Sequence, residues 1–175
     1  MTAAPPGQDA LRGLAEFNGR PADAARRALL DCCSAARWAD DLVAGRPYRS
    51  AASLLRRSDR AVAALPQAGL AAALDGHPRI GDRAAAGRRW SGPEQAGVAA
   101  ADPAALRALA DGNQAYEQRF GHIYLVCAAG RTAAELLAVL RARLANDPAT
   151  EWEVVRCELQ KINRIRLAAL LGGSA

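Results

Sequence analysis

The stretch QAGLAAALDGHPRIG, residues 67–81, combines a helix-favouring run with residues that end a helix. Its first eight residues are rich in alanine and leucine, which favours a helix. A glycine, a proline and a second glycine then follow, and neither a helix nor a strand continues easily through them. Pro78 also pushes His77 away from the α conformation, so the imidazole is held on a stiff loop. The stretch therefore predicts a short helix and then a rigidly presented, accessible histidine.

The same alternation of helix and breaker extends over the whole chain. Alanine dominates the apolar residues, whereas aromatic and β-branched residues are scarce, which favours helices over strands. Cap signals and breakers predict helices over about 21–33, 34–43, 50–65, 67–74, 91–119 (interrupted or restarted at 102–103), 132–145 and 149–171. Residues 82–90 are expected to form a loop, and the β-prone run 123–128 is too isolated to build a sheet. We predict an all-α, single-domain bundle of six to eight helices over residues 1–175, with residues 1–13 disordered or loosely attached.

Composition also argues against several function classes. The net charge of +5 comes from 22 arginines and one lysine spread along the whole chain, without the clustered base-reading residues of a nucleic-acid-binding protein. No apolar run approaches the roughly 20 residues that cross a bilayer, and no signal peptide is visible, so we expect a cytoplasmic protein that binds no membrane. The four cysteines form no Cys-x-x-Cys pair, and the chain has two histidines. We therefore expect no metal site, and we interpret the cysteines as small buried hydrophobic residues.

A charged residue interrupts the apolar face of the expected last helix. Val155, Leu159, Ile162, Arg166 and Ala169 recur at spacings of four, three, four and three, so they form one stripe. An arginine in this stripe needs a carboxylate, a phosphate or carbonyl groups, because an unpaired buried charge costs several kcal/mol. Arg166 is thus either a ligand-binding residue or a structural partner of an acid such as Glu94, or it extends toward solvent.

Two further polar positions have a structural and a functional interpretation. Ser91 and Glu94 have the spacing of a capping box at a helix start, a role that needs no function. The same helix start could bind an anion or a carbonyl group. His122 lies outside any motif, and we expect it at the surface or at the edge of the core.

Several motifs in order resemble the 2-oxo-4-hydroxy-4-carboxy-5-ureidoimidazoline (OHCU) decarboxylases of uric acid degradation. They are His77-Pro78-Arg79-Ile80-Gly81, Ser91-x-x-Glu94-Gln95-Ala96-Gly97, Asn113-x-x-Tyr116 with Arg119-Phe120-Gly121, Val126-Cys127-Ala128-x-Gly130-Arg131 and the closing Lys161-Ile162-x-x-Ile165-Arg166-Leu167. The resemblance covers roughly residues 14–170. One departure is His122-Ile123, where relatives usually have Phe-Pro, and this change could reshape the rim of the pocket.

The resemblance implies an all-α homodimer that converts the ureide OHCU to (S)-allantoin and carbon dioxide without a cofactor. It implies that His77, Glu94 and Arg166 are catalytic. The implied substrate-binding residues are Pro78, Ser91, Gly92, Pro93, Glu94, Gln95, Tyr124, Leu125, Val126, Cys127 and Ala128. The alternatives are a non-enzymatic helical binding module and a different cofactor-free lyase or hydrolase acting on a related ureide.

Overall fold

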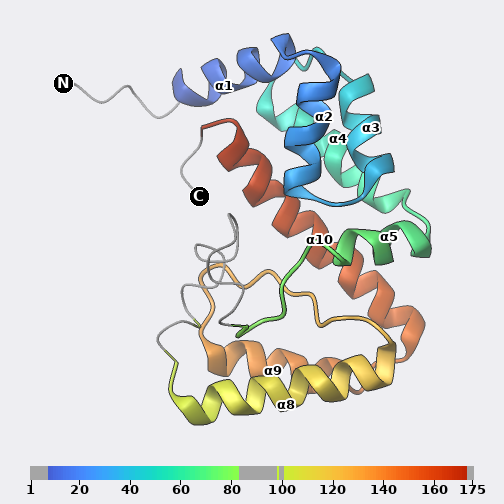
Figure 1. Ribbon diagram of the computed structural model, residues 1–175, viewed down its shortest axis with the longest axis vertical. Helices are drawn as coiled ribbons and strands as arrows, with labels where there is room; N and C mark the ends of the chain where they lie inside the picture. The colour runs from blue at the N-terminus through green and yellow to red at the C-terminus, as the bar shows by residue number, and fades with distance from the viewer. Residues whose placement is uncertain (1–7, 83–97, 99–100, 173–175) are drawn as a thin grey trace, which may run out of the picture. The chain divides into compact units, whose positions relative to one another are not determined.

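The computed structural model describes residues 8–82, 98 and 101–172, and these residues form eight α-helices and no strand (Figure 1). The all-α prediction is therefore confirmed for the described chain. The described residues contain no helix that is both long enough and apolar enough to span a membrane. The chain divides into two compact units, residues 1–75 with 160–175, and residues 76–159. The single-domain organisation stays a prediction.

The first unit contains α1 (Gln8–Gly19), α2 (Ala22–Cys32), α3 (Ala36–Ala44), α4 (Ala51–Ala63), α5 (Gln67–Leu74) and the second half of α10 (Pro148–Leu170). Helix α2 packs on α3, and α3 packs on α4 (Figure 1). Trp38 is fully buried between these helices, and its indole N–H donates a 3.0 Å hydrogen bond to the Ser58 hydroxyl. The predicted bounds of α2 to α5 agree with the structure to within two residues.

Helix α1 corrects the expectation of a loose N-terminus. Residues 8–13 form its first half, whereas residues 1–7 lie outside the described chain. Leu14 and Phe17 are buried and pack the helix against the rest of the unit, and Gly13 allows a close approach to another segment. A β carbon at Gly13 would lie 2.0 Å from the carbonyl oxygen of Leu171, so only glycine permits this approach. Helix α1 was not predicted, because these tertiary contacts leave no local sequence signal.

The second unit contains α8 (Pro103–Phe120), α9 (Ala133–Arg143) and the first half of α10. Helices α8 and α9 pack side by side (Figure 1). Asp102 begins α8 by accepting hydrogen bonds from the N–H groups of Ala104 and Ala105, so the predicted restart at 102–103 is confirmed. Thr132 and Glu135 form the predicted capping box of α9. The predicted helix start at 91 lies outside the described residues.

The β-prone run 123–128 is an extended segment that forms no strand, as predicted. Tyr124, Val126 and Ala128 alternate along it and enter the core of the second unit together with Leu109, Leu136 and Leu140. The prediction that the four cysteines are buried is confirmed for two of them. Cys32 and Cys33 are buried, but Cys127 is half-buried and Cys157 is exposed.

Candidate active site

His77 lies in the loop that follows α5, as the sequence predicts, but its side chain is buried rather than accessible. Its exposed fraction is 8%, and Pro78 beside it is half-buried. The loop closes with a turn in which the Asp82 N–H donates to the Arg79 carbonyl at 3.2 Å. Gly81 takes a positive φ of 82° in this turn, a conformation that disfavours residues with a β carbon. The imidazole is therefore shielded from solvent on a short, tightly turned segment.

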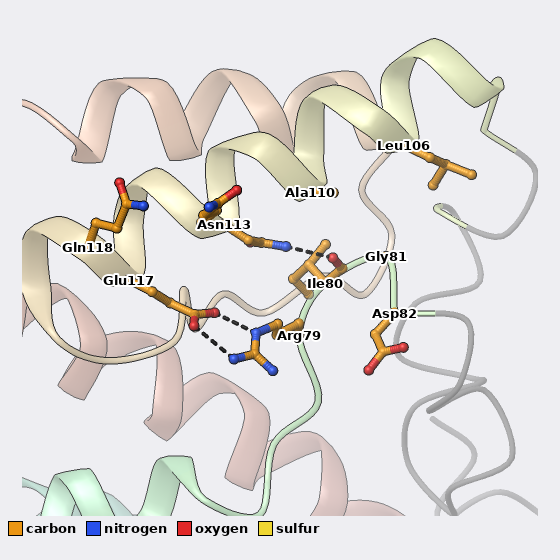
Figure 2. Close-up of a pocket in the computed structure, with 10 residues that line it drawn as sticks. Arg79, Ile80, Gly81, Asp82, Leu106, Ala110, Asn113, Glu117 and Gln118 are labelled. Carbon is orange, nitrogen blue, oxygen red and sulfur yellow. Dashed lines mark hydrogen bonds and ion pairs between the residues drawn. The ribbon is translucent and has the colours of Figure 1, made fainter.

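Helix α8 fastens this loop at two points, which Figure 2 shows as dashed lines. The Asn113 side-chain amide donates a 2.9 Å hydrogen bond to the carbonyl of Ile80, and both residues are buried. One turn further along, the Glu117 carboxylate accepts two hydrogen bonds from the Arg79 guanidinium, at 2.5 and 2.8 Å. Hydrogen bonding to Arg79 holds the pKa of Glu117 below its ordinary value, against the effect of partial burial. The residues that follow His77 are thus attached to one face of α8.

A cavity of about 560 Å³ lies between the loop and α8 (Figure 2). Its lining residues are Arg79, Ile80, Gly81, Asp82, Leu106, Ala110, Asn113, Gln114, Glu117 and Gln118. The Asn113 side-chain oxygen has no hydrogen-bond partner among the described residues. The described residues that we predicted to contact substrate do not line this cavity.

The extended segment 123–128 is held through its main chain. The Arg143 guanidinium donates a 2.7 Å hydrogen bond to the carbonyl of Leu125, and the Cys127 N–H donates to a Glu158 carboxylate oxygen at 2.8 Å. The Tyr124 hydroxyl donates to the Leu136 carbonyl at 3.1 Å, and burial raises the pKa of Tyr124 to about 12. These contacts fix the shape of the segment that is expected, from the resemblance, to bind substrate.

Arg143 belongs to a buried polar network. Its Nε donates to Glu151 Oε1 at 2.8 Å, and the Tyr116 hydroxyl donates to the same carboxylate oxygen. Asn146 donates to the second oxygen of Glu151 at 2.7 Å. The guanidinium also lies 4.9 Å from the centre of the Tyr124 ring. Burial disfavours the charged form of Arg143, but the hydrogen bond to Glu151 and the electrostatic attraction of Glu151 and the two tyrosines together raise its pKa. Burial and the bond to Glu151 raise the pKa of Tyr116.

Arg166 lies in the first unit and is buried on the predicted stripe of α10, with Val155, Leu159 and Ile162. Its guanidinium donates a 2.7 Å hydrogen bond to the carbonyl of Cys32, the last residue of α2. A cation at this end of a helix is favoured by the helix dipole and by the unpaired carbonyls there. Burial raises the pKa of the neighbouring Cys33 thiol, although the charge of Arg166 opposes this shift. The partner of Arg166 is thus a carbonyl group, one of the three kinds expected, but the sequence did not indicate that it belongs to Cys32.

Arg166→Lys is expected to impair turnover per folded molecule and to lower the melting temperature by only a few degrees. Lysine keeps the charge but lacks the planar fork that binds a carboxylate through two parallel hydrogen bonds. Circular dichroism melting and turnover, measured on one preparation, check this prediction. A large loss of stability with normal activity per folded molecule would mean that the role of Arg166 is structural.

The described chain brings together part of the predicted site. His77, Pro78 and the segment Tyr124–Ala128 belong to the second unit, whereas Arg166 belongs to the first. The predicted residues Ser91, Gly92, Pro93, Glu94 and Gln95 lie outside the described residues. His122 is at the edge of the core, as expected, with its ring centre 4.3 Å from that of Trp152.

Asn113, Arg143 and Glu151 were not among the site residues predicted from the sequence. The signal that identified Arg166 could have found Arg143, because Ala133, Leu136, Leu140 and Arg143 recur at spacings of three, four and three. Asn113 likewise interrupts an apolar stripe, because it lies four residues after Leu109 and three before Tyr116. Glu151 gives no such signal, because it lies near the start of α10, where an acid is ordinary. The described residues hold no cluster of three or more His, Cys, Asp or Glu that could bind a metal ion.

These features define an all-helical protein in which a buried histidine loop and an extended segment are both attached to α8 and its neighbours. The chain belongs to the OHCU decarboxylase family, whose model matches residues 18–168. The enzymes that give this family its name are carboxy-lyases.

Two relatives support the assignment of the chain to this family. The chain is 29% identical over 150 residues to the uric acid degradation bifunctional protein TTL of Arabidopsis thaliana, covering 82% of this chain and 46% of that protein. It is 28% identical over 132 residues to the 2-oxo-4-hydroxy-4-carboxy-5-ureidoimidazoline decarboxylase of Amia calva, covering 73% and 75%. The chain therefore spans about half the length of the Arabidopsis relative and three quarters of the Amia one.

Solved structures with the same fold include an OHCU decarboxylase crystallised in the presence of (S)-allantoin. That structure has a TM-score of 0.71 and 26% identity, covering 82% of this chain and 96% of the other. An (S)-allantoin synthase structure has a TM-score of 0.68 over 90% of this chain and 53% of the other. At 17% identity, the second likeness concerns the fold alone.

Proposed function

We propose that this chain decarboxylates OHCU to (S)-allantoin in urate degradation. The observation that carries the proposal is the family match over residues 18–168, which includes the His77 loop and Arg166. The buried, tightly turned loop supports it, because it holds in place an imidazole, the side chain whose unperturbed pKa of about 6.5 suits proton transfer near neutral pH. A homodimer is part of the proposal and rests on the resemblance to the family.

The chemistry of the substrate explains why the reaction needs no cofactor. The carboxylated ring carbon of OHCU is adjacent to a ring C=N bond, which accepts the electron pair released when the C–C bond to the carboxylate breaks. The ring nitrogen then takes up a proton, and the C4 hydroxyl loses one as its carbon becomes a carbonyl. A proton added to the neighbouring carbon from one face gives a single enantiomer of allantoin.

Each proposed catalytic residue has one task in this scheme. Arg166 binds the carboxylate and holds it out of the ring plane, aligned with the C=N bond, which is catalysis by positioning. His77 exchanges a proton with the C4 hydroxyl or the developing ring anion, and Glu94 orients the imidazole. The main chain of residues 124–128 and the side chains of Ser91 and Gln95 hold the ring. The Cys127 N–H already donates to Glu158, so we expect other backbone groups of this segment to meet the substrate.

The test generates OHCU from urate in situ and follows optically active allantoin by circular dichroism. The protein is expected to accelerate the appearance of the (S)-allantoin signal above a reaction without protein. The absence of any acceleration by folded protein would refute the proposal. A helical binding module would give that result.

Chelation by EDTA is expected to leave the decarboxylation rate unchanged. The physical reason is the internal electron sink of the substrate, which makes a Lewis acid unnecessary. The rate before and after chelation and dialysis checks this prediction. A rate that falls on chelation and returns when a divalent cation is added would contradict it.

A further inference from the structure

We infer that α8 is a positioning element for the reaction, and that Asn113 is the residue through which it sets the place of His77. The inference rests on the proposed function, because it assigns His77 the proton transfer. Helix α8 contacts both segments to which the proposal gives substrate contacts, the His77 loop and residues 123–128. It reaches the first directly and the second through a chain of buried hydrogen bonds.

The contact of Asn113 with the loop is a buried hydrogen bond. Asn113 is 5% exposed, and its amide donates at 2.9 Å to the Ile80 carbonyl, three residues after His77. Losing this donor leaves a buried carbonyl without its partner, which costs more than the bond itself contributes. The loop would then shift to find another partner, and His77 would move with it. The Arg79–Glu117 ion pair next to it is more exposed, so solvent weakens it, and it cannot replace the buried bond.

The contact with the extended segment starts at Tyr116, which lies on the same face of α8 as Asn113 because three residues separate them. The Tyr116 hydroxyl donates to Glu151, which binds Arg143, and Arg143 donates to the Leu125 carbonyl at 2.7 Å. Each member of this chain of bonds is buried. The spacing of Asn113 and Tyr116 along one rigid helix therefore fixes the His77 loop relative to the segment 123–128.

A group that only stabilises the fold and a group that positions a catalyst differ in what they change. A misplacement of about 1 Å can lower a rate roughly a hundredfold, because reacting groups must be aligned before the reaction occurs. Loss of stability, in contrast, lowers only the folded fraction. Kinetic constants expressed per folded molecule separate the two.

The experiment replaces Asn113 by leucine, which has the same number and branching of side-chain heavy atoms but donates no hydrogen bond. The matched control is Gln114→Ala, because Gln114 is the next residue on α8, lines the same cavity and is exposed. For Asn113→Leu we expect kcat per folded molecule to fall roughly tenfold to a hundredfold with little change in KM. The control is expected to behave as the unmodified protein.

A second measurement needs no substrate. The chain has two histidines, so the imidazole proton resonances can be assigned with a single variant, His122→Gln. In Asn113→Leu the His77 resonance is expected to shift or broaden, whereas the His122 resonance stays in place. If the leucine variant does not fold, Asn113→Asp keeps the shape. An ionised carboxylate cannot donate to Ile80, but a protonated one can. Its activity per folded molecule should therefore recover as the pH falls, a dependence that the unmodified protein lacks.

The outcomes separate this inference from the proposed function. If the unmodified protein fails to accelerate formation of (S)-allantoin, the function is wrong, and the resonances still report whether Asn113 positions the loop. If the unmodified protein is active but the Asn113 variants keep its kcat, pH profile and His77 resonance, the positioning role alone is wrong.

Discussion

Replacing His77 by asparagine is expected to lower kcat for OHCU decarboxylation by about a hundredfold or more, the usual scale for a general acid–base group. Asparagine retains a planar polar side chain of lesser volume, but it cannot exchange a proton near neutral pH. Because His77 is buried, alanine would leave a cavity and could also destabilise the loop. Asparagine is therefore the better probe. Turnover followed by circular dichroism on protein of known folded fraction checks the prediction.

The natural control for this variant is His122→Gln, which removes the other histidine of the chain. His122 lies against the Trp152 ring at the edge of the core, and the proposed mechanism assigns it neither a proton transfer nor a substrate contact. It is expected to keep most of the activity. Near-normal turnover by folded His77→Asn protein, or an equal loss in both variants, would remove His77 from the mechanism.

Replacing Glu151 by glutamine is expected to destabilise the fold by about 3–5 kcal/mol, the usual cost of leaving a buried charge without its partner. Glu151 is fully buried and binds Arg143, Tyr116 and Asn146. Glutamine fits the space and keeps one carbonyl oxygen, but it cannot balance the guanidinium charge. Urea unfolding of the variant and of the unmodified protein measures the difference in free energy.

A second variant separates the charge effect from a packing effect. Arg143→Met combined with Glu151→Gln removes both charges, and it is expected to recover more than half of the stability lost in Glu151→Gln alone. The effects of two substitutions on the free energy of unfolding are not additive when the residues are in contact. The recovery therefore measures the coupling between Arg143 and Glu151. A double variant whose loss equals the sum of the two single losses would mean that the pair is not coupled.

Much of the fold could be predicted because local signals decide it. Thr132 with Glu135, and Asp102 before Pro103, mark helix starts that need no tertiary information. Gly121 ends α8 with a φ of 74°, as a glycine at a helix end favours. Helix α1 was missed because its stability comes from tertiary contacts of Gly13, Leu14 and Phe17, which the local pattern does not report.

The sequence indicates which residues are candidates for the site, but it does not indicate how buried they are or what they contact. Pro78 and its glycines indicated a stiff histidine loop, but they did not indicate that His77 is buried or that Asn113 holds the loop. Burial of a loop residue depends on segments far along the chain, such as α8, more than 30 residues away. For the same reason, the stripe on α10 identified Arg166 but not its contact with the carbonyl of Cys32, 134 residues away.

The division of the chain also constrains how the protein folds as the ribosome makes it. The second unit is one continuous stretch, residues 76–159, whereas the first combines residues 1–75 with 160–175. Its long-range bonds join Asp59 to Gln160 and Arg164, and Cys32 to Arg166, across more than 100 residues. Contacts so far apart in sequence form late. We therefore expect the second unit, whose chain is continuous, to complete its core before the first. Helices α1–α5 are translated first, but the core of the first unit can form only after the last turns of α10 have left the ribosome.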